Sequence, residues 1–266
     1  MTWIFNRKFR KMIARIEITG AIGSTTRTRV LEALEFVEKN HFPALLLRID
    51  SPGGTVGDSQ EIYQALKRIR QKTKVIASFG NISASGGIYI GVGADHIVSN
   101  PGTITGSIGV ILRGNNLEKL LERLGVSFKV IKSGPYKDIL AFDREITEAE
   151  KQILQSLIDH SYDQFVQTVA EGRKLSTATV RSFADGSVFT GEQALNLGLV
   201  DRLGCEEDAR AWAAELVGLD PKQTKTFTIK PPKSLANRLL PGSNTLISEL
   251  QFQLETAGMP LWLWRP

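Results

Sequence analysis

The fold of this chain is decided by residues 75–87, which read VIASFGNISASGG. Residues 75–79 form a short apolar run typical of a buried strand, and small residues replace it directly afterwards. A small-residue turn that joins a strand to a helix lifts one hydroxyl, here that of Ser85, clear of the sheet edge. The same turn points free backbone N–H groups toward whatever that hydroxyl attacks. Ser85 is therefore the first candidate for a chemically active residue, and we expect its hydroxyl to face solvent.

A second glycine turn, DSPGG at residues 50–54, follows the preceding apolar run at residues 44–49. Either turn alone is usually only a loop or a tight turn. Two such turns at neighbouring strand ends, each followed by a helical pattern, predict a nucleophile beside an oxyanion hole. The pair does not separate a peptidase from an acyl-CoA enzyme, because both stabilise an oxyanion with two backbone N–H groups.

The rest of the chain alternates between strand and helix periodicity. The expected strands are 12–22, 44–49, 74–79, 95–99, 109–112 and 126–131, and the expected helices are 25–40, 58–72, 117–124, 147–171, 177–184, 191–197 and 206–217. Thr147 and Glu150 predict a capping box at the start of the longest helix. This alternation predicts an α/β fold with a mainly parallel sheet, whose chemistry gathers at the carboxyl ends of the strands.

Composition limits the function classes. The chain has 266 residues, 42% of them hydrophobic, which is enough for one substantial core. Its formal net charge of +5 is too small to indicate a nucleic-acid partner by itself. The single cysteine, Cys205, excludes an internal disulfide and a cysteine-rich metal site, and we expect it at a helix start or a packing position. We expect neither a metal nor another cofactor.

The two ends of the chain differ from its middle. Residues 1–11 are basic and aromatic, with Phe9 among the cations, and they do not read as a signal peptide. No segment approaches the roughly 18–20 uncharged apolar residues that span a bilayer. We therefore expect a cytoplasmic protein, or one that is peripheral on a membrane.

The C-terminal extension, residues 220–266, ends in the aromatic residues Trp262 and Trp264. The N-terminal segment adds Trp3 and Phe5 to this set of aromatic side chains without an evident place in the core. We expect both ends to contact a membrane interface or a neighbouring protomer. Packing against the chain's own domain is the alternative.

A serine nucleophile needs a base. None of the three histidines, His41, His96 and His160, has an acidic partner at an expected strand end. Lys137 stands in a glycine-proline loop after the expected strand at 126–131. A lysine accepts a proton near neutrality only when its surroundings disfavour the charged amine. Spacing alone leaves the choice of base open.

Four blocks in one order carry a resemblance to a known family. They are SPGG at 51–54, SASGGIY at 83–89, TGSIGV at 105–110 and KSGPYKD at 132–138. Residues 12–217 resemble the short bacterial form of signal peptide peptidase A, a Ser-Lys peptidase with the Clp-protease/crotonase fold. The resemblance implies a peptidase domain over 12–219, which would give three parts with the N-terminal segment 1–11 and the extension 220–266.

The resemblance also implies a role for each matching residue. Ser85 would be the nucleophile, Lys137 the general base, and Ser107 the hydroxyl that helps to hold the lysine amine. Gly54 and Gly86 would supply the backbone N–H groups of the oxyanion hole. The expected substrates are short hydrophobic peptides such as cleaved signal peptides. The family assembles into ring-like homo-oligomers, and in its short forms the serine and the lysine of one site can come from neighbouring protomers.

Two departures from the family pattern bear on function. The family commonly carries an N-terminal membrane anchor, which we do not find in this sequence, and GGIY at 86–89 stands where GGYY is frequent. A crotonase-type acyl-CoA enzyme and a non-catalytic scaffold at the membrane are the alternative functions. The acyl-CoA enzyme would need neither Ser85 nor Lys137.

Overall fold

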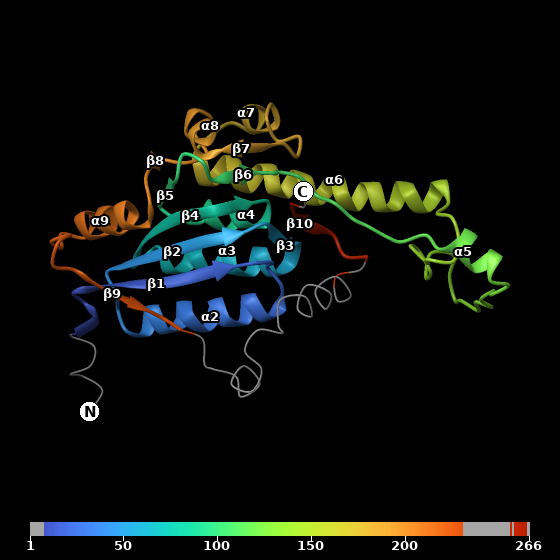
Figure 1. The fold of residues 1–266 in the computed structure, drawn as a ribbon, viewed down its shortest axis with the longest axis horizontal. Coiled ribbons are helices and arrows are strands. Elements are labelled where there is room, and N and C mark those ends of the chain that lie inside the picture. Colours follow the sequence, from blue (N-terminus) through green and yellow to red (C-terminus); the bar gives the residue numbers. More distant parts are fainter. Residues whose placement is uncertain (1–7, 231–255, 257, 265–266) are drawn as a thin grey trace.

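The computed structural model describes residues 8–230, 256 and 258–264 of the chain (Figure 1). Over these residues the strands form an eight-stranded, mostly parallel sheet in the order β7-β6-β4-β2-β1-β9, with β5 and β8 joined to it through β4. Helices cover both faces of this sheet, as Figure 1 shows. The α/β fold expected from the sequence is therefore confirmed.

Three long parallel strands form the centre of the sheet: β1 (Met12–Thr19), β2 (Ala44–Ser51) and β4 (Lys74–Ala84). Their residues alternate between two cores. Leu45 and Leu47 of β2 face the larger core, and Leu46 faces the smaller one. A strand that is buried on both faces needs apolar residues at every position, which explains the continuous run ALLL at 44–47.

Two layers of helices cover these cores. The helices α2 (Ser24–Lys39), α3 (Val56–Ile69) and α4 (Gly86–Gly91) bury their apolar faces in the larger core, while α9 (Glu206–Leu216) lies over the smaller one. The inner end of α6 (Glu148–Arg173) adds Phe165 and Val169 to the larger core. The capping box expected at the start of α6, between Thr147 and Glu150, is present.

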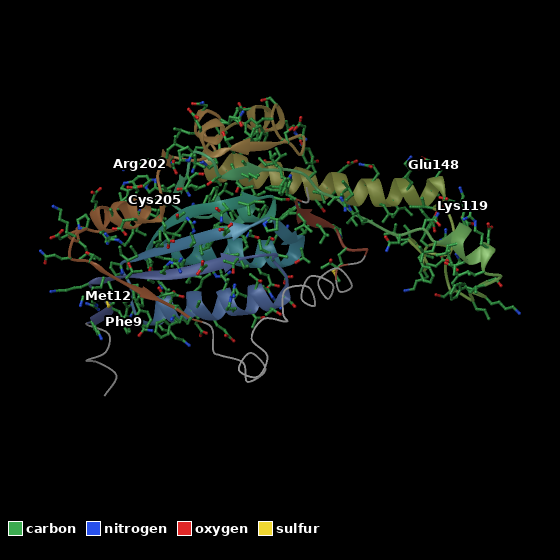
Figure 2. All side chains as sticks on the ribbon, in the orientation of Figure 1. Phe9, Met12, Lys119, Glu148, Arg202 and Cys205 are labelled. Carbon is green, nitrogen blue, oxygen red and sulfur yellow. The ribbon has the colours of Figure 1, made fainter. Side chains whose placement is uncertain are left out.

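The remaining elements are short. They are β3 (Gly53–Thr55), β5 (His96–Ser99), β6 (Ile104–Gly106), α5 (Glu118–Arg123), α7 (Thr177–Arg181), β7 (Val188–Thr190), α8 (Gly191–Asn196), β8 (Arg202–Leu203), β9 (Lys225–Thr228) and β10 (Leu261–Leu263). The N-cap of α9 is Cys205, so the expected position of this cysteine at a helix start is confirmed (Figure 2).

An arm formed by residues 112–147 and the outer half of α6 projects beyond the end of the sheet (Figure 1). The strand predicted over 126–131 is wrong, because this segment has no neighbouring strand to pair with and forms none. The predicted strand at 109–112 is reduced to a single bridge between Ile111 and Leu261. Alternating apolar residues form a strand only where a partner supplies the hydrogen bonds.

The expectation that the aromatic residues at both ends have no place in the core is wrong for Phe9 and Trp262. Phe9 packs against Phe42 and Phe227, with ring centroids 4.8 and 5.1 Å away, and Trp262 is fully buried in the larger core. Both rings cover apolar surface of their own domain, which removes more of that surface from water than a free end would. Trp3 and Phe5 lie outside the described residues.

The sheet continues beyond residue 219, because β9 pairs with β1 in parallel. The boundary between a peptidase domain and an extension at 219/220 stays a prediction. Across the described ranges, no helix combines the length and the apolar character that crossing a membrane would require.

Candidate active site

Ser85 occupies the turn between β4 and α4, as the sequence predicts. Its backbone has φ 53° and ψ −115°, a conformation that non-glycine residues rarely adopt. Two hydrogen bonds hold this conformation: the Ser85 N–H donates to the Gly106 carbonyl at 2.8 Å, and the Ser85 carbonyl accepts from Tyr89 N–H at 3.0 Å. Backbone strain that the surroundings enforce in this way is typical of functional positions.

Contrary to expectation, Ser85 does not face solvent. Only 1% of its surface is exposed. A serine that acts as a nucleophile must contact its substrate. The residues that cover this turn therefore bear on function as much as the turn itself.

The two glycine turns lie against each other. A Cβ atom added at Gly86 would lie 3.1 Å from the Gly54 nitrogen, and one added at Gly53 would lie 2.7 Å from the Gly86 nitrogen. A Cβ at Gly54 would lie 1.9 Å from the Ile22 carbonyl oxygen, so no side chain fits there. The backbone N–H groups of Gly54 and Gly86 are thus brought together beside Ser85, which is the arrangement an oxyanion hole needs.

Ser107 lies at the end of the strand next to that of Ser85. β6 pairs with β4 so that Gly106 aligns with Ala84, and each serine directly follows one of these two residues. Ser107 is largely buried and has φ 50°, and its N–H donates to the Ser187 carbonyl at 2.7 Å. The structure therefore brings Ser85, Ser107, Gly54 and Gly86 to one edge of the sheet.

Lys137 is not brought to this edge within one chain. It is exposed on the arm, next to Asp138, which is linked through Arg144 to Glu150 at the outer end of α6. From Glu150 to Phe165, the α6 residue that packs against Tyr89, the helix runs for about 22 Å. Figures 1 and 2 agree: α5, Lys119 and Glu148 all lie at the far end of the arm.

Ion pairs join the loop at Asp138 to the outer end of α6. Asp138 accepts hydrogen bonds from Lys132 and Arg144, and the Arg144 guanidinium also pairs with Glu150. The Arg144 guanidinium, together with the Thr147 N–H, holds the pKa of Glu150 at about 2, below its ordinary value of 4.5. The pKa of Asp138 is likewise lowered by its bonds to Arg144 and Lys132.

The histidines do not lie at the strand ends that carry Ser85. His96 begins β5 and aligns with Ile76, nine residues before Ser85 along β4. Its ring stacks on Trp212 at 4.5 Å, and burial lowers its pKa. His41 follows the end of α2, and the His160 ring is bonded to the Ser156 carbonyl on exposed α6. Within the described ranges, no cluster of His, Cys, Asp and Glu side chains could hold a metal ion.

The sequence analysis did not predict the short strands β3, β6 and β10 at the site, and β10 is the least expected of them. The tail strand β10 pairs with β3 in antiparallel fashion, with Trp262 opposite Gly54 and Leu263 opposite Gly53. The Trp262 ring packs against the tilted rings of Tyr89 and Phe165, with centroids 4.0 and 4.7 Å away. The only signal in the sequence was an apolar terminus that had to be covered by something.

Comparisons with known proteins agree with this geometry. The model of peptidase family S49 matches residues 67–220, and that of Clp protease matches residues 4–100. A Synechocystis sp. protein provisionally named protease slr0021 is 62% identical over 277 residues, covering 100% of both chains. An Enterococcus faecium protein provisionally named signal peptide peptidase SppA is 36% identical over 212 residues, which are 75% of this chain and 62% of that protein.

Solved structures show the same fold. A 1510-N membrane-bound stomatin-specific protease in complex with a substrate peptide has a TM-score of 0.60 at 18% identity, covering 90% of this chain and 97% of that one. ClpP1 from Listeria monocytogenes has a TM-score of 0.52 at 18% identity, covering 77% of this chain and 98% of that one. The S49 match covers more than half of this chain and includes the Ser85 turn. The chain therefore belongs to peptidase family S49 and is a serine peptidase.

Proposed function

We propose that this peptidase cleaves short hydrophobic peptides, such as cleaved signal peptides, through a Ser85–Lys137 dyad that two copies of the chain complete together. The observation that carries the proposal is the packing of the Ser85 turn against the Gly53–Gly54 turn. It puts a hydroxyl and two backbone donors at one point of the sheet edge. Acyl transfer uses this combination of groups.

The proposed reaction has two halves. The Ser85 Oγ attacks the peptide carbonyl carbon while the neutral Lys137 amine takes the hydroxyl proton. The N–H groups of Gly54 and Gly86 stabilise the oxyanion, and the lysine then gives the proton to the leaving amine. Water attacks the resulting ester by the reverse route and frees Ser85. Ser107 would hold the lysine amine in place between the two halves.

The structure of the arm supports a dyad whose serine and lysine come from different copies of the chain. It separates Lys137 from Ser85 within one chain, and its surface is apolar where a lone chain would meet water. The exposed apolar residues of the arm and the adjoining part of α6 are Leu117, Leu120, Leu124, Val126, Phe128, Val130, Ile131, Tyr136, Phe142, Ile146, Ile153 and Leu157. An exposed apolar patch of this kind marks a protein contact. Packed against a neighbour, the arm would deliver Lys137 to the neighbour's Ser85, and repetition of this head-to-tail contact would close a ring.

Hydrophobic substrates fit the surroundings of Ser85, where Tyr89, Phe165 and Trp262 form an aromatic cluster. The relative named signal peptide peptidase SppA supports the narrower substrate class. Peripheral contact with a membrane would bring the enzyme to such peptides. We place the protein in the cytoplasm or on the membrane surface.

Mixing two inactive variants tests the proposal. Ser85→Ala keeps the lysine and Lys137→Ala keeps the serine, so each alone should fail to cleave a hydrophobic reporter peptide. Co-assembled in equal amounts, they should regain up to about a quarter of wild-type activity, because a quarter of random head-to-tail contacts pair the two intact residues. Labelling of wild type, but not of Ser85→Ala, by a fluorophosphonate would identify the nucleophile.

Other results would change the proposal in different ways. Activity of Lys137→Ala alone would place the base elsewhere. Two inactive variants that do not complement each other would place the dyad within one copy. Wild type that neither reacts with a fluorophosphonate nor cleaves any peptide of a hydrophobic library would favour a binding scaffold.

A further inference from the structure

The tail strand β10, residues 261–263, lies where an extended peptide would have to lie to reach Ser85. One edge of β10 pairs with β3, the strand that carries Gly53 and Gly54. On its other edge the Leu261 N–H donates to the Ile111 carbonyl at 2.8 Å, and the Ile111 N–H donates to the Leu261 carbonyl at 3.0 Å. The tail is therefore held through its backbone on both sides, by β3 and by a single bridge to Ile111. Proteins that bind extended peptides by strand addition hold them in the same way.

The carbonyl oxygen of Trp262 lies close to Gly53, on the turn that also carries Gly54. A Cβ atom added at Gly53 would lie 1.9 Å from the Trp262 oxygen and 2.7 Å from the Gly86 nitrogen. Both atoms thus approach the same point, which is on the Gly53–Gly54 turn. A peptide cleaved by Ser85 must present its carbonyl to these donors. The Trp262 carbonyl thus lies beside the same turn that a substrate carbonyl must approach.

The side chain of Trp262 fills a closed aromatic pocket. None of its surface is exposed, and it packs against Tyr89 from α4 and Phe165 from α6. Its indole N–H is buried without a hydrogen-bond partner. Burial of an unpaired donor weakens binding, so the pocket selects a large apolar shape and does not recognise the indole nitrogen. The pocket therefore holds the Trp262 ring by its shape, and another large apolar side chain can take its place.

We propose that residues 261–263 occupy the peptide-binding groove of their own chain and compete with the substrate for it. This proposal rests on the proposed function, because it takes the edge at Ser85 as the peptide site. It accounts for the burial of Ser85, which is otherwise unexpected for a nucleophile. It also assigns the Tyr89–Phe165 pocket to a large apolar side chain of the peptide.

Substitution of Trp262 tests the competition in the full chain. Trp262→Ala should leave the groove open more of the time, so KM for a hydrophobic reporter peptide should fall by roughly fivefold or more while kcat stays the same. The rate at which a fluorophosphonate labels Ser85 should rise by a similar factor. Met259→Ala is the control on the tail, because Met259 is 48% exposed and precedes the strand. Phe42→Ala is the control for a cavity in the same core far from the tail, since its ring lies in the Phe9 cluster.

A synthetic peptide with the sequence of residues 258–266 supplies a second measurement. It should inhibit Trp262→Ala competitively and wild type more weakly, because the wild-type groove already holds its own tail. The same peptide with alanine in place of Trp262, and with Trp264 retained, should inhibit neither. With lysine in that place it should also fail, since the pocket offers no partner for a charge.

The results separate this inference from the proposed function. If wild type is labelled at Ser85 but Trp262→Ala changes neither KM nor labelling and the peptide does not inhibit, the tail is only a structural strand and the inference is overturned. If Trp262→Ala and Phe42→Ala speed labelling equally, the effect is loosening of the core, which also overturns it. If wild type and all variants resist labelling, the proposed function fails instead. Mass spectrometry of purified wild type should find an intact C-terminus, and a chain ending at Trp262 would show that the tail is cut as a substrate and is not a stable competitor.

Discussion

The sheet edge at Ser85 and the arm that carries Lys137 are built in opposite ways. At the sheet edge, backbone hydrogen bonds from β6 and α4 hold Ser85, and glycines let two turns touch where no Cβ would fit. On the arm, Lys137 is exposed, the surrounding apolar side chains lack a cover, and an ion-pair network joins the loop at Asp138 to the outer end of α6. A single chain thus forms the turns that carry the proposed nucleophile and the proposed oxyanion donors. The arm has the features of a surface that is completed by contact with another molecule.

The strongest test of this contrast is substitution of each residue of the proposed dyad, starting with Ser85→Ala. Peptidase activity should fall by roughly 10³-fold or more, because the remaining groups of a catalytic unit give only residual catalysis. The melting temperature should stay the same, because alanine keeps the Cβ at φ 53° and removes only the hydroxyl. Assay of cleavage beside a thermal melt checks both. Turnover above a trace would remove Ser85 as the nucleophile.

Lys137→Arg should reduce activity as much as Lys137→Ala, because arginine keeps the charge and the length but cannot release its proton near neutral pH. Neither change should alter the melting temperature, since the side chain is exposed and outside the core. Lys119→Arg, a substitution on the same arm, is the control and should be silent. Normal rates in Lys137→Arg would mean that another residue is the base.

The apolar surface of the arm gives the next largest effect. Ile131 is fully exposed in one chain, so Ile131→Asp should leave the folded monomer unaffected. The same change would bury a charge if the arm packs on a neighbour, and should therefore shift the assembly to smaller species and lower activity at least about tenfold. Light scattering and the peptide assay measure the two outcomes. Unchanged size and activity would show that the arm is not an interface.

The smallest effect concerns the ion pairs at the outer end of α6 in acid. The pKa of Glu150 is lowered to about 2, so its contribution to stability is fully present above its ordinary pKa of 4.5 and is lost as pH falls from there toward 2. The protection of the amides of residues 138–150 against hydrogen exchange, relative to the intrinsic exchange rate at each pH, should therefore fall over this window in wild type. Glu150→Gln should show low protection at neutral pH already, with less change in acid. Glu148→Gln, whose side chain is exposed at the same helix end, should behave like wild type.

The parts of the fold that the sequence predicts are those whose cause is local. The Ser85 turn, the strand residues 44–49 and the capping box at Thr147 depend on neighbours a few residues away. The short strands β3, β6 and β10 were not predicted, because strands this short exist only through pairing with distant parts of the chain. The placement of Trp262 over Gly54 joins residues more than two hundred positions apart, and no local pattern encodes it.

The arm shows the opposite kind of error. The alternation VSFKVI at 126–131 reads as a strand, but its apolar residues are exposed and it has no partner strand in the described chain. Because residues 126–131 were expected to be a strand, Lys137 was expected in a loop at the end of a strand of the sheet. Motif order alone pointed to Lys137 as the base. Which chain's serine it serves is a question of assembly that a single sequence does not state.

The helix α6 also sets a rule for how this protein can change in length. Its inner end is fixed in the core by Phe165 and Val169, and its outer end carries the arm. The helix is therefore a rigid spacer of about 39 Å. Each residue inserted into its outer half would lengthen the helix by about 1.5 Å and turn the arm by about 100° about the helix axis. Only steps near seven or eleven residues return the arm to its original direction. Variation in this helix should therefore come in whole turns, and any one such step changes the reach to the neighbour by about 10 Å or more.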